Sequence, residues 1–314
     1  MEGPLTILPA MKTIRLLAFI ASGASYLLIV LGGWVRISGS GMGCGDDWPL
    51  CNGQLIPSLS DPATLIEWSH RLVAFAVSAL VVGVAALGYR RRQDPKVSGP
   101  GGPLRPAVLA VVLMLIQVLL GAITVWMELP AAAVILHLST AMAMVAALLV
   151  AGLNAGQRQV DSEWTGAAST WRSAVVALVL AGVAVLMGGV TANMGAAGSC
   201  MGFPLCNGQI FPTGGSGGLS HIHWFHRLVA YGLTLHLIGM AIRVARRKAP
   251  VVVRRVTTVA MAVTVIQIVV GAAMMLSVLQ AHWRATHVAA GTAVWVAMVV
   301  FAWYARPSQS EGTA

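Results

Sequence analysis

Four histidines are the residues of this sequence best suited to chemistry. His70 and His226 each open the pentapeptide HRLVA, and His137 and His287 follow at matching places that are 150 residues apart. All four lie in apolar stretches, where a polar side chain is costly and usually serves a function. Two imidazoles that face each other across a helical bundle can bind a haem iron from both sides. The simpler alternative is that each histidine caps a helix or bonds a neighbour, and zinc fits poorly because neither pair has a matched third ligand.

A carboxylate next to the first of these histidines has no counterpart in the second half. When the halves are aligned on HRLVA, Glu67 stands opposite His223. Glu67 precedes His70 by three residues, so both side chains project from the same helix face. The sequence therefore predicts a proton relay or general base at Glu67, the alternative being an acidic residue that interacts with a helix dipole. Arg71 directly follows His70 and Arg227 directly follows His226, and both arginines are candidate contacts for haem propionates or ordinary interfacial anchors.

All four cysteines lie in two loops that precede these histidines. The first loop contains Cys44 and Cys51, and the second contains Cys200 and Cys206. Their repetition predicts one disulfide within each loop, formed in an oxidising compartment. Each pair could staple its loop or could transfer electrons, and the absence of CXXC spacing favours the staple.

The chain is an internal duplication. Both halves contain PLCNGQ and HRLVA, the segment IQVLLGA (116–122) matches IQIVVGA (266–272), and Gly32-Gly33 matches Gly188-Gly189. A shared pattern of this length is not accidental. Each half therefore holds one copy of the same unit.

The elements that position these residues are membrane-spanning helices. Hydrophobic residues make up 57% of the 314 residues and charged residues only 10%. This composition excludes a water-soluble domain of the ordinary kind. Stretches without charge are long enough to cross a bilayer as helices. We expect eight spans, near 14–35, 69–89, 107–127, 132–153, 173–193, 222–242, 256–277 and 285–305.

The net charge of +10 reports membrane orientation. Sixteen of the 20 basic residues fall at the termini and in the segments after even-numbered spans. The positive-inside rule then places both termini in the cytoplasm. Because the charge is explained in this way, it does not indicate a nucleic-acid partner.

An even number of spans per copy inserts both copies the same way up, as a parallel repeat. We expect an all-α integral membrane protein of two tandem four-helix bundles, residues 1–157 and 158–314. The first is predicted to hold the reacting haem, and the second a haem that stores or relays electrons.

Taken together, the spans, the duplication, EWSHR, HWFHR and both CNGQ loops resemble the haem A synthase family, in its bacterial form with cysteine pairs. The resemblance covers nearly the whole chain. It implies oxidation of a ring methyl of haem O to a formyl group, giving haem A by two successive hydroxylations. It also implies that His70 and His137 hold the substrate haem, that His226 and His287 ligate a haem b, and that Glu67 is catalytic.

The resemblance extends to location and partners. It implies a bacterial plasma membrane, a haem O synthase (farnesyltransferase) that supplies the substrate, a terminal oxidase that receives the product, and an electron donor that the sequence does not identify. It leaves open whether one imidazole leaves the substrate iron during turnover or oxidation proceeds without oxygen bound there.

Three other functions use parts of the same pattern. A di-haem cytochrome b that transfers electrons from quinol needs the four histidines but not Glu67. A quinone-linked disulfide oxidoreductase needs the cysteines and no haem. A transporter is compatible with a parallel repeat, but no broken helix supports it.

Overall fold

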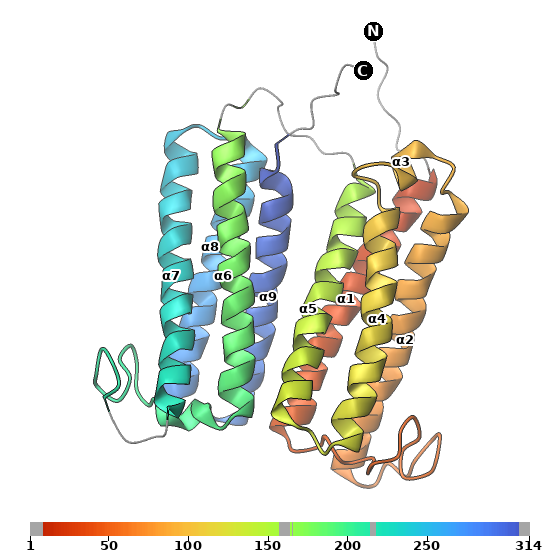
Figure 1. Ribbon diagram of the computed structural model, residues 1–314, viewed down its shortest axis with the longest axis vertical. Helices are drawn as coiled ribbons and strands as arrows, with labels where there is room; N and C mark the ends of the chain where they lie inside the picture. Colours follow the sequence, from red (N-terminus) through yellow and green to blue (C-terminus); the bar gives the residue numbers. More distant parts are fainter. Residues whose placement is uncertain (1–8, 157–163, 165, 214–217, 308–314) are drawn as a thin grey trace. The chain divides into compact units, whose positions relative to one another are not determined.

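The computed structural model describes residues 9–156, 164, 166–213 and 218–307. Its eight long helices are α1 (Pro9–Ile37), α2 (Pro62–Arg90), α4 (Leu104–Trp126), α5 (Ala131–Asn154), α6 (Ala167–Asn193), α7 (Leu219–Arg246), α8 (Val251–Leu276) and α9 (Ala281–Ala305) (Figure 1). Two short elements, α3 (Pro95–Ser98) and the 3₁₀ helix η1 (Ala196–Ser199), were not predicted. Each long helix is long and apolar enough to cross a membrane, which confirms the eight predicted spans.

Several helices begin earlier than predicted. Helix α2 starts at Pro62, seven residues before the predicted span, and α6 starts at Ala167. The length of a charge-free stretch reflects the thickness of the hydrocarbon core. A helix can extend beyond that core until its end is capped, so it can be longer than the charge-free stretch. At α2 the cap is Asp61, whose side chain accepts a hydrogen bond of 2.8 Å from the Thr64 backbone N–H, as a helix N-cap does. This bond holds the pKa of the exposed Asp61 carboxyl below its ordinary value. Glu67 consequently lies inside α2.

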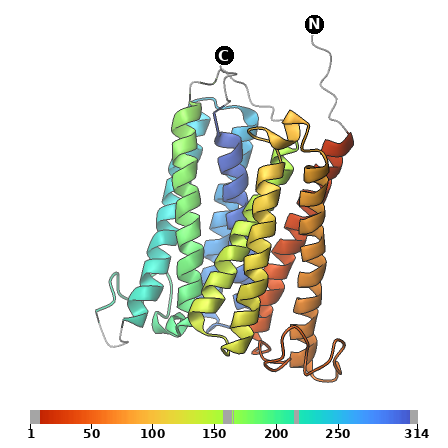
Figure 2. The same ribbon diagram turned by 45° about the vertical axis from the view of Figure 1, so that its right-hand side comes forward.

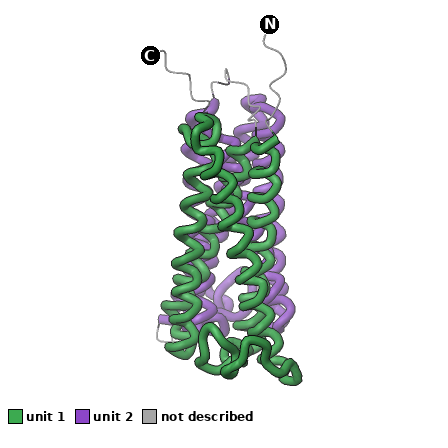
Figure 3. Tube along the Cα trace, turned by 90° about the vertical axis from the view of Figure 1, so that its right-hand side faces the viewer, with its two compact units in different colours: residues 1–158 green, residues 159–314 purple. Residues whose placement is uncertain are grey.

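The helices group into two compact units, residues 1–158 and 159–314, coloured separately in Figure 3. The predicted boundary between 157 and 158 lies outside the described residues. In unit 1, helices pack around a closed ring in the order α1, α2, α4, α5, and α5 returns to α1. In unit 2 the order is α6, α7, α8, α9, and α9 returns to α6. Each unit is thus a four-helix bundle. Its first and third helices lie diagonally opposite each other, and so do its second and fourth helices.

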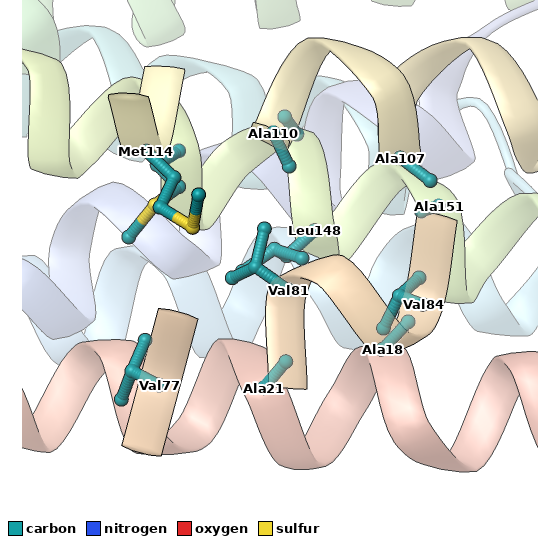
Figure 4. Close-up of a cluster of buried hydrophobic side chains, with 12 residues drawn as sticks. Ala18, Ala21, Val77, Val81, Val84, Ala107, Ala110, Met114, Leu148 and Ala151 are labelled. Carbon is teal, nitrogen blue, oxygen red and sulfur yellow. The ribbon is translucent and has the colours of Figure 1, made fainter. Parts of the chain in front are cut away.

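Small residues line the packed interior of each bundle. In unit 1 the interior cluster includes Ala18 and Ala21 of α1, Ala107 and Ala110 of α4, and Val81 of α2 (Figure 4). Lipid removes the hydrophobic drive for helices to associate, so close contact between backbones must stabilise the bundle. Alanine permits that approach. Large apolar side chains such as Phe75, which is 75% exposed, point outward instead.

The long helices of a unit run side by side over their length, as both ribbon views show (Figure 2). Short connections join consecutive helices, so neighbours in the ring are antiparallel and diagonal helices are parallel. The second and fourth helices of each unit therefore begin at the same end of their bundle. The loops that carry the cysteines lie at that end.

Core packing generates a first prediction. Phe301 is fully buried among α6, α7 and α9. Phe301→Ala should destabilise the chain by about 2 kcal/mol or more, because removal of the ring leaves a cavity. Phe75→Ala removes the same group from an exposed site and should change stability by no more than about 0.5 kcal/mol. Unfolding in mixed micelles measures both. Equal losses for the two variants would contradict the assigned interior.

Candidate functional site

The four histidines occupy equivalent positions on diagonal helices. His70 lies on α2 and His137 on α5, and His226 lies on α7 and His287 on α9, all within the first three turns of their helices. The ring centroids of His226 and His287 are 6.3 Å apart, with planes at 73°. In unit 1, His70 of α2 and His137 of α5 lie near the same end of two diagonal helices. The structure therefore brings together each pair that the sequence analysis selected.

A glycine of the neighbouring helix faces each imidazole. A Cβ added to Gly32 would lie 3.0 Å from Cε1 of His70, and one added to Gly188 would lie 3.2 Å from Cε1 of His226. The same contact recurs at Gly121, where a Cβ would lie 3.5 Å from Cε1 of His137. A ring can lie this close to a helix only where no side chain intervenes. The repeated glycines are thus part of the site rather than generic packing residues.

These residues fit the axial ligands of a haem. His226 Nδ1 lies 3.0 Å from the Ala184 carbonyl oxygen, an arrangement that leaves the other ring nitrogen free for a metal. In unit 1, the Nδ1 atoms of His70 and His137 are buried and have no hydrogen-bond partner among the described residues. Buried polar atoms without partners are rare and call for an explanation. Two nitrogen donors on diagonal helices, within a bundle, suit an iron porphyrin.

Glu67 is buried, with only 4% of its surface exposed, and both of its oxygens are bonded. Oε2 accepts a hydrogen bond of 2.9 Å from the Cys44 backbone N–H, and Oε1 forms an ion pair with Arg71. Charge-assisted bonds of this kind hold a carboxylate in one orientation. Glu67 is therefore fixed between the histidine-bearing helix and the cysteine loop.

Arg71 and Arg227 bind the loops. Arg71 Nη1 donates to the carbonyl oxygens of Asp47 and Leu50, at 2.9 and 2.5 Å. Arg227 donates to the carbonyl oxygens of Leu205 and Cys200, at 3.0 and 2.5 Å. These partners do not follow from the sequence, because nothing in the spacing relates an arginine on a helix to backbone carbonyls of a preceding loop. Contact of either arginine with a propionate stays a prediction.

The two disulfides predicted from the cysteine pattern are present. Sulfur atoms are 1.99 Å apart in Cys44–Cys51 and 2.11 Å apart in Cys200–Cys206. The CNGQ segment begins at the second cysteine of each pair and forms a two-residue hairpin turn, with positive φ at both Asn and Gly. Asn-Gly is the dipeptide that such a turn favours. The repeated motif is thus explained by loop geometry.

Tryptophans tie the loops back to the helices. The Trp68 indole N–H donates to the Leu55 carbonyl at 3.0 Å, and the Trp224 indole N–H donates to the Ile210 carbonyl at 2.6 Å. Trp68 comes two residues before His70, and Trp224 comes two residues before His226. The loops are therefore held close to the histidine end of each bundle.

The position of Glu67 is taken by His223 in unit 2. His223 is buried, and its Nδ1 lies 3.2 Å from the Ala196 carbonyl oxygen in η1. Both residues link the second helix of a unit to its loop, but only Glu67 is a carboxylate. His236, which has no counterpart in unit 1, bonds the Ser173 carbonyl oxygen at 2.9 Å.

Known proteins match this chain over most of its length. The family model described as cytochrome oxidase assembly protein (COX15-CtaA) matches residues 15–299. The chain is 31% identical to the haem A synthase of Shouchella clausii over 235 residues, which are 74% of this chain and 76% of the relative. It is 30% identical to the haem A synthase of Alkalihalophilus pseudofirmus over 233 residues, with the same two shares.

The chain belongs to this family. The resemblance to haem A synthases noted from the motifs is confirmed. The match spans all four histidines, Glu67 and both cysteine pairs. A shorter match, 38% identical over 125 residues, connects 38% of the chain to 37% of the haem A synthase of Bacillus cereus. Family membership makes the chain an oxidoreductase of the membrane.

The loop contact generates a second prediction. A Cβ at Gly43 would meet the backbone of Ala63 and lie 2.7 Å from the Thr64 nitrogen, and the Gly43 carbonyl accepts the Thr64 hydroxyl at 2.7 Å. Because backbone cannot move aside cheaply, Gly43→Ala should destabilise the protein by about 1–3 kcal/mol. Limited proteolysis and thermal unfolding in detergent measure the effect.

Gly41→Ala is the matched control. Its Cβ would meet only the side chain of Leu129, whose methyl groups can rotate away. If the Gly43 variant is as stable as the Gly41 variant, the loop does not contact α2 as described.

Proposed function

We propose that the chain is a haem A synthase, which oxidises a ring methyl of haem O to the formyl group of haem A. The observation that carries the proposal is the pair of facing histidines in both bundles, with a buried carboxylate beside only one of the pairs. Duplicated imidazoles account for two haems, and the single Glu67 accounts for chemistry in one bundle. The relatives that bear this activity match three quarters of the chain.

In unit 1, His70 and His137 hold the substrate by its iron. The histidines lie close to the end of the bundle where the cysteine loop folds over. Glu67 lies one turn before His70 on the same face of α2, so its carboxylate stands near the edge of a macrocycle held by that imidazole. Glu67 is the general base there, and the Cys44 N–H and Arg71 keep it in place.

Oxidation proceeds by two successive hydroxylations of the same methyl. Each hydroxylation takes one oxygen atom from dioxygen and releases the other as water, with two electrons from the electron donor and two protons. The first gives a hydroxymethyl group and the second a gem-diol, which loses water to leave the aldehyde. As the gem-diol collapses, Glu67 accepts a proton from one hydroxyl group and returns it to the departing hydroxide, which leaves as water.

In unit 2, His226 and His287 hold a haem b. When bound, this cofactor supplies one-electron transfer toward the reacting bundle. The Ala184 carbonyl orients His226, and no carboxylate stands at the position of Glu67. The absence of a carboxylate beside this pair suits a haem that carries electrons and is not itself modified.

The eight apolar helices and the bacterial relatives place the chain in a bacterial membrane as a multi-pass protein. We propose that this is the plasma membrane, with both termini in the cytoplasm, as the positive-inside rule indicates. The cysteine loops then lie in the oxidising extracytoplasmic space, where disulfides persist and staple the loops. The proposed partners are a haem O synthase, a terminal oxidase under assembly and an electron donor.

Histidine variants test the division between the bundles. The purified chain should carry haem, and His226→Ala or His287→Ala should remove haem b while haem O or haem A stays extractable. His70→Ala or His137→Ala should have the reverse effect. Pigment extraction and an absorbance spectrum measure both. A colourless wild-type chain made with ample porphyrin would refute the proposal and favour a disulfide oxidoreductase.

Glu67→Gln tests the catalytic carboxylate. The variant should form haem A at least about 100-fold more slowly, because loss of a general base typically costs a factor of this size. Bound haem b should be unchanged. Glu128→Gln, at an exposed carboxylate, is the control and should retain activity. Normal haem A formation by the Glu67 variant would remove the catalytic role from Glu67, whereas a wild-type chain that binds haem but forms no haem A would indicate a di-haem cytochrome.

A further inference from the structure

The turn that joins α7 to α8 concentrates positive charge at one end of unit 2. This end lies opposite to the cysteine loop, which is tied to the start of α7 (Figure 1). Six basic residues fall between positions 243 and 255, and all of them are exposed: Arg243, Arg246, Arg247, Lys248, Arg254 and Arg255. We refer to these six residues as the basic cluster.

The basic cluster lacks a matching number of negative charges. Residues 166–213 and 218–307, which form the described part of unit 2, contain no Asp or Glu. The other acidic residues of this half are Asp161, Glu163 and Glu311, which lie outside the described residues and are too few to balance six cations. Like charges held close together repel each other. An external anion would relieve this repulsion.

The hydrogen bonds from the basic cluster to described side chains go to neutral groups. Arg243 Nη1 donates to Ser173 Oγ at 3.2 Å, and Arg247 Nη1 donates to Ser169 Oγ at 3.1 Å. A hydroxyl group orients a guanidinium but does not neutralise it. The cations of α7 are therefore held in place with their charge still available.

The equivalent turn of unit 1 is built differently. Asp94 lies among its basic residues, and the guanidinium of Arg92 lies over the Tyr89 ring, 4.2 Å from the centroid. A carboxylate and an aromatic face each stabilise a neighbouring cation. Unit 1 therefore meets part of this need from its own side chains, whereas the described part of unit 2 has no carboxylate to do so.

The positive-inside rule explains on which side of the membrane these residues lie, but not their places within the turn. Arg243 and Arg246 suit the last turn of α7, where the helix dipole is negative. Arg254 and Arg255 lie within the first five residues of α8, where the dipole is positive and favours an anion instead. The N-cap residue Pro250 makes no side-chain capping bond. A bound anion would offset the unfavourable position of this arginine pair.

An apolar cluster beneath the turn fixes its backbone. Val244, Ala249 and Val253 are buried and pack together with Trp164. The Ala249 backbone N–H also donates to the Val244 carbonyl oxygen at 3.0 Å, which closes the turn. The cations therefore project from a defined frame.

Exposed apolar side chains lie next to the basic cluster. Ile242 on α7 is 49% exposed, and Val251 and Val259 on α8 are 52% and 56% exposed. On a membrane-spanning helix such side chains contact acyl chains. A ligand with a negative headgroup and acyl chains therefore matches both the cations and their apolar surroundings. Free phosphate matches only the cations.

We propose that the basic cluster binds the headgroup of an anionic phospholipid, whose acyl chains lie along Ile242, Val251 and Val259. Groups of four to eight basic residues directly beside a membrane helix attract anionic lipids. Arginine suits the phosphate because its planar group of donors binds two oxygens at once. This interaction goes beyond the proposed function and does not depend on haem.

Lipid titration of the full-length chain in a non-ionic detergent tests the site. Phosphatidylglycerol and phosphatidylcholine with the same acyl chains are added, and native mass spectrometry measures the affinity of each. The wild type should prefer phosphatidylglycerol. Arg254→Gln combined with Arg255→Gln should weaken its binding about 30-fold, because each basic residue near an anionic lipid contributes roughly a factor of five. Lysine at both positions keeps the charge and should keep the preference.

Arg90→Gln combined with Arg91→Gln is the matched control. It removes two exposed cations from the equivalent end of unit 1, lowers the net charge equally, and should leave the affinity unchanged. Equal losses in the two double variants would show general charge attraction and overturn the site. Equal binding of both lipids by the wild type would also overturn it. Displacement of the lipid by an equal concentration of inorganic phosphate would overturn the lipid as occupant and assign the cluster to free phosphate.

Discussion

The structure depends on the cost of placing polar groups inside an apolar bundle. An imidazole or a carboxylate buried between membrane helices has no water to bond, so each must find a partner in the protein or in a bound group. Glu67 accepts a hydrogen bond from the Cys44 backbone N–H and forms an ion pair with Arg71. The histidines of unit 1 still have Nδ1 atoms without a partner among the described residues. This difference separates residues that the protein itself satisfies from residues that are available to a haem and its neighbours.

The same constraint explains why the cysteine loop of unit 1 is held by several restraints. A carboxylate inside a membrane helix can be held only by donors that reach it, and here the donor is a backbone N–H within a disulfide loop. The disulfide, the Asn-Gly turn and the tryptophan bond each restrict that loop. Arg71 then joins the loop carbonyls to the carboxylate itself. The loop is therefore part of the site and not merely its cover.

Duplication followed by divergence accounts for the remaining differences. Both units keep the same ring of helices, the same glycines against the histidines and the same loop turn. They differ where Glu67 is replaced by His223, which bonds the 3₁₀ helix η1 instead of a cysteine N–H. One bundle thus keeps a carboxylate next to its histidines and the other does not. One difference, Glu67 in unit 1 and His223 in unit 2, is sufficient to place different side chains beside equivalent histidine pairs in two bundles of the same architecture.

Sequence alone determined the number of long helices, the duplication, the histidine pairs and the disulfides. These features depend on composition, period and repetition, which are local or self-similar along the chain. The tertiary structure decided where α2 begins, that Arg71 and Arg227 bind loop carbonyls, and that Gln267 contacts His287. Such contacts join residues on different elements, and their geometry follows from how closely two helices approach. The distance between two helices is set by the packing of the whole bundle, and a local sequence pattern does not predict it.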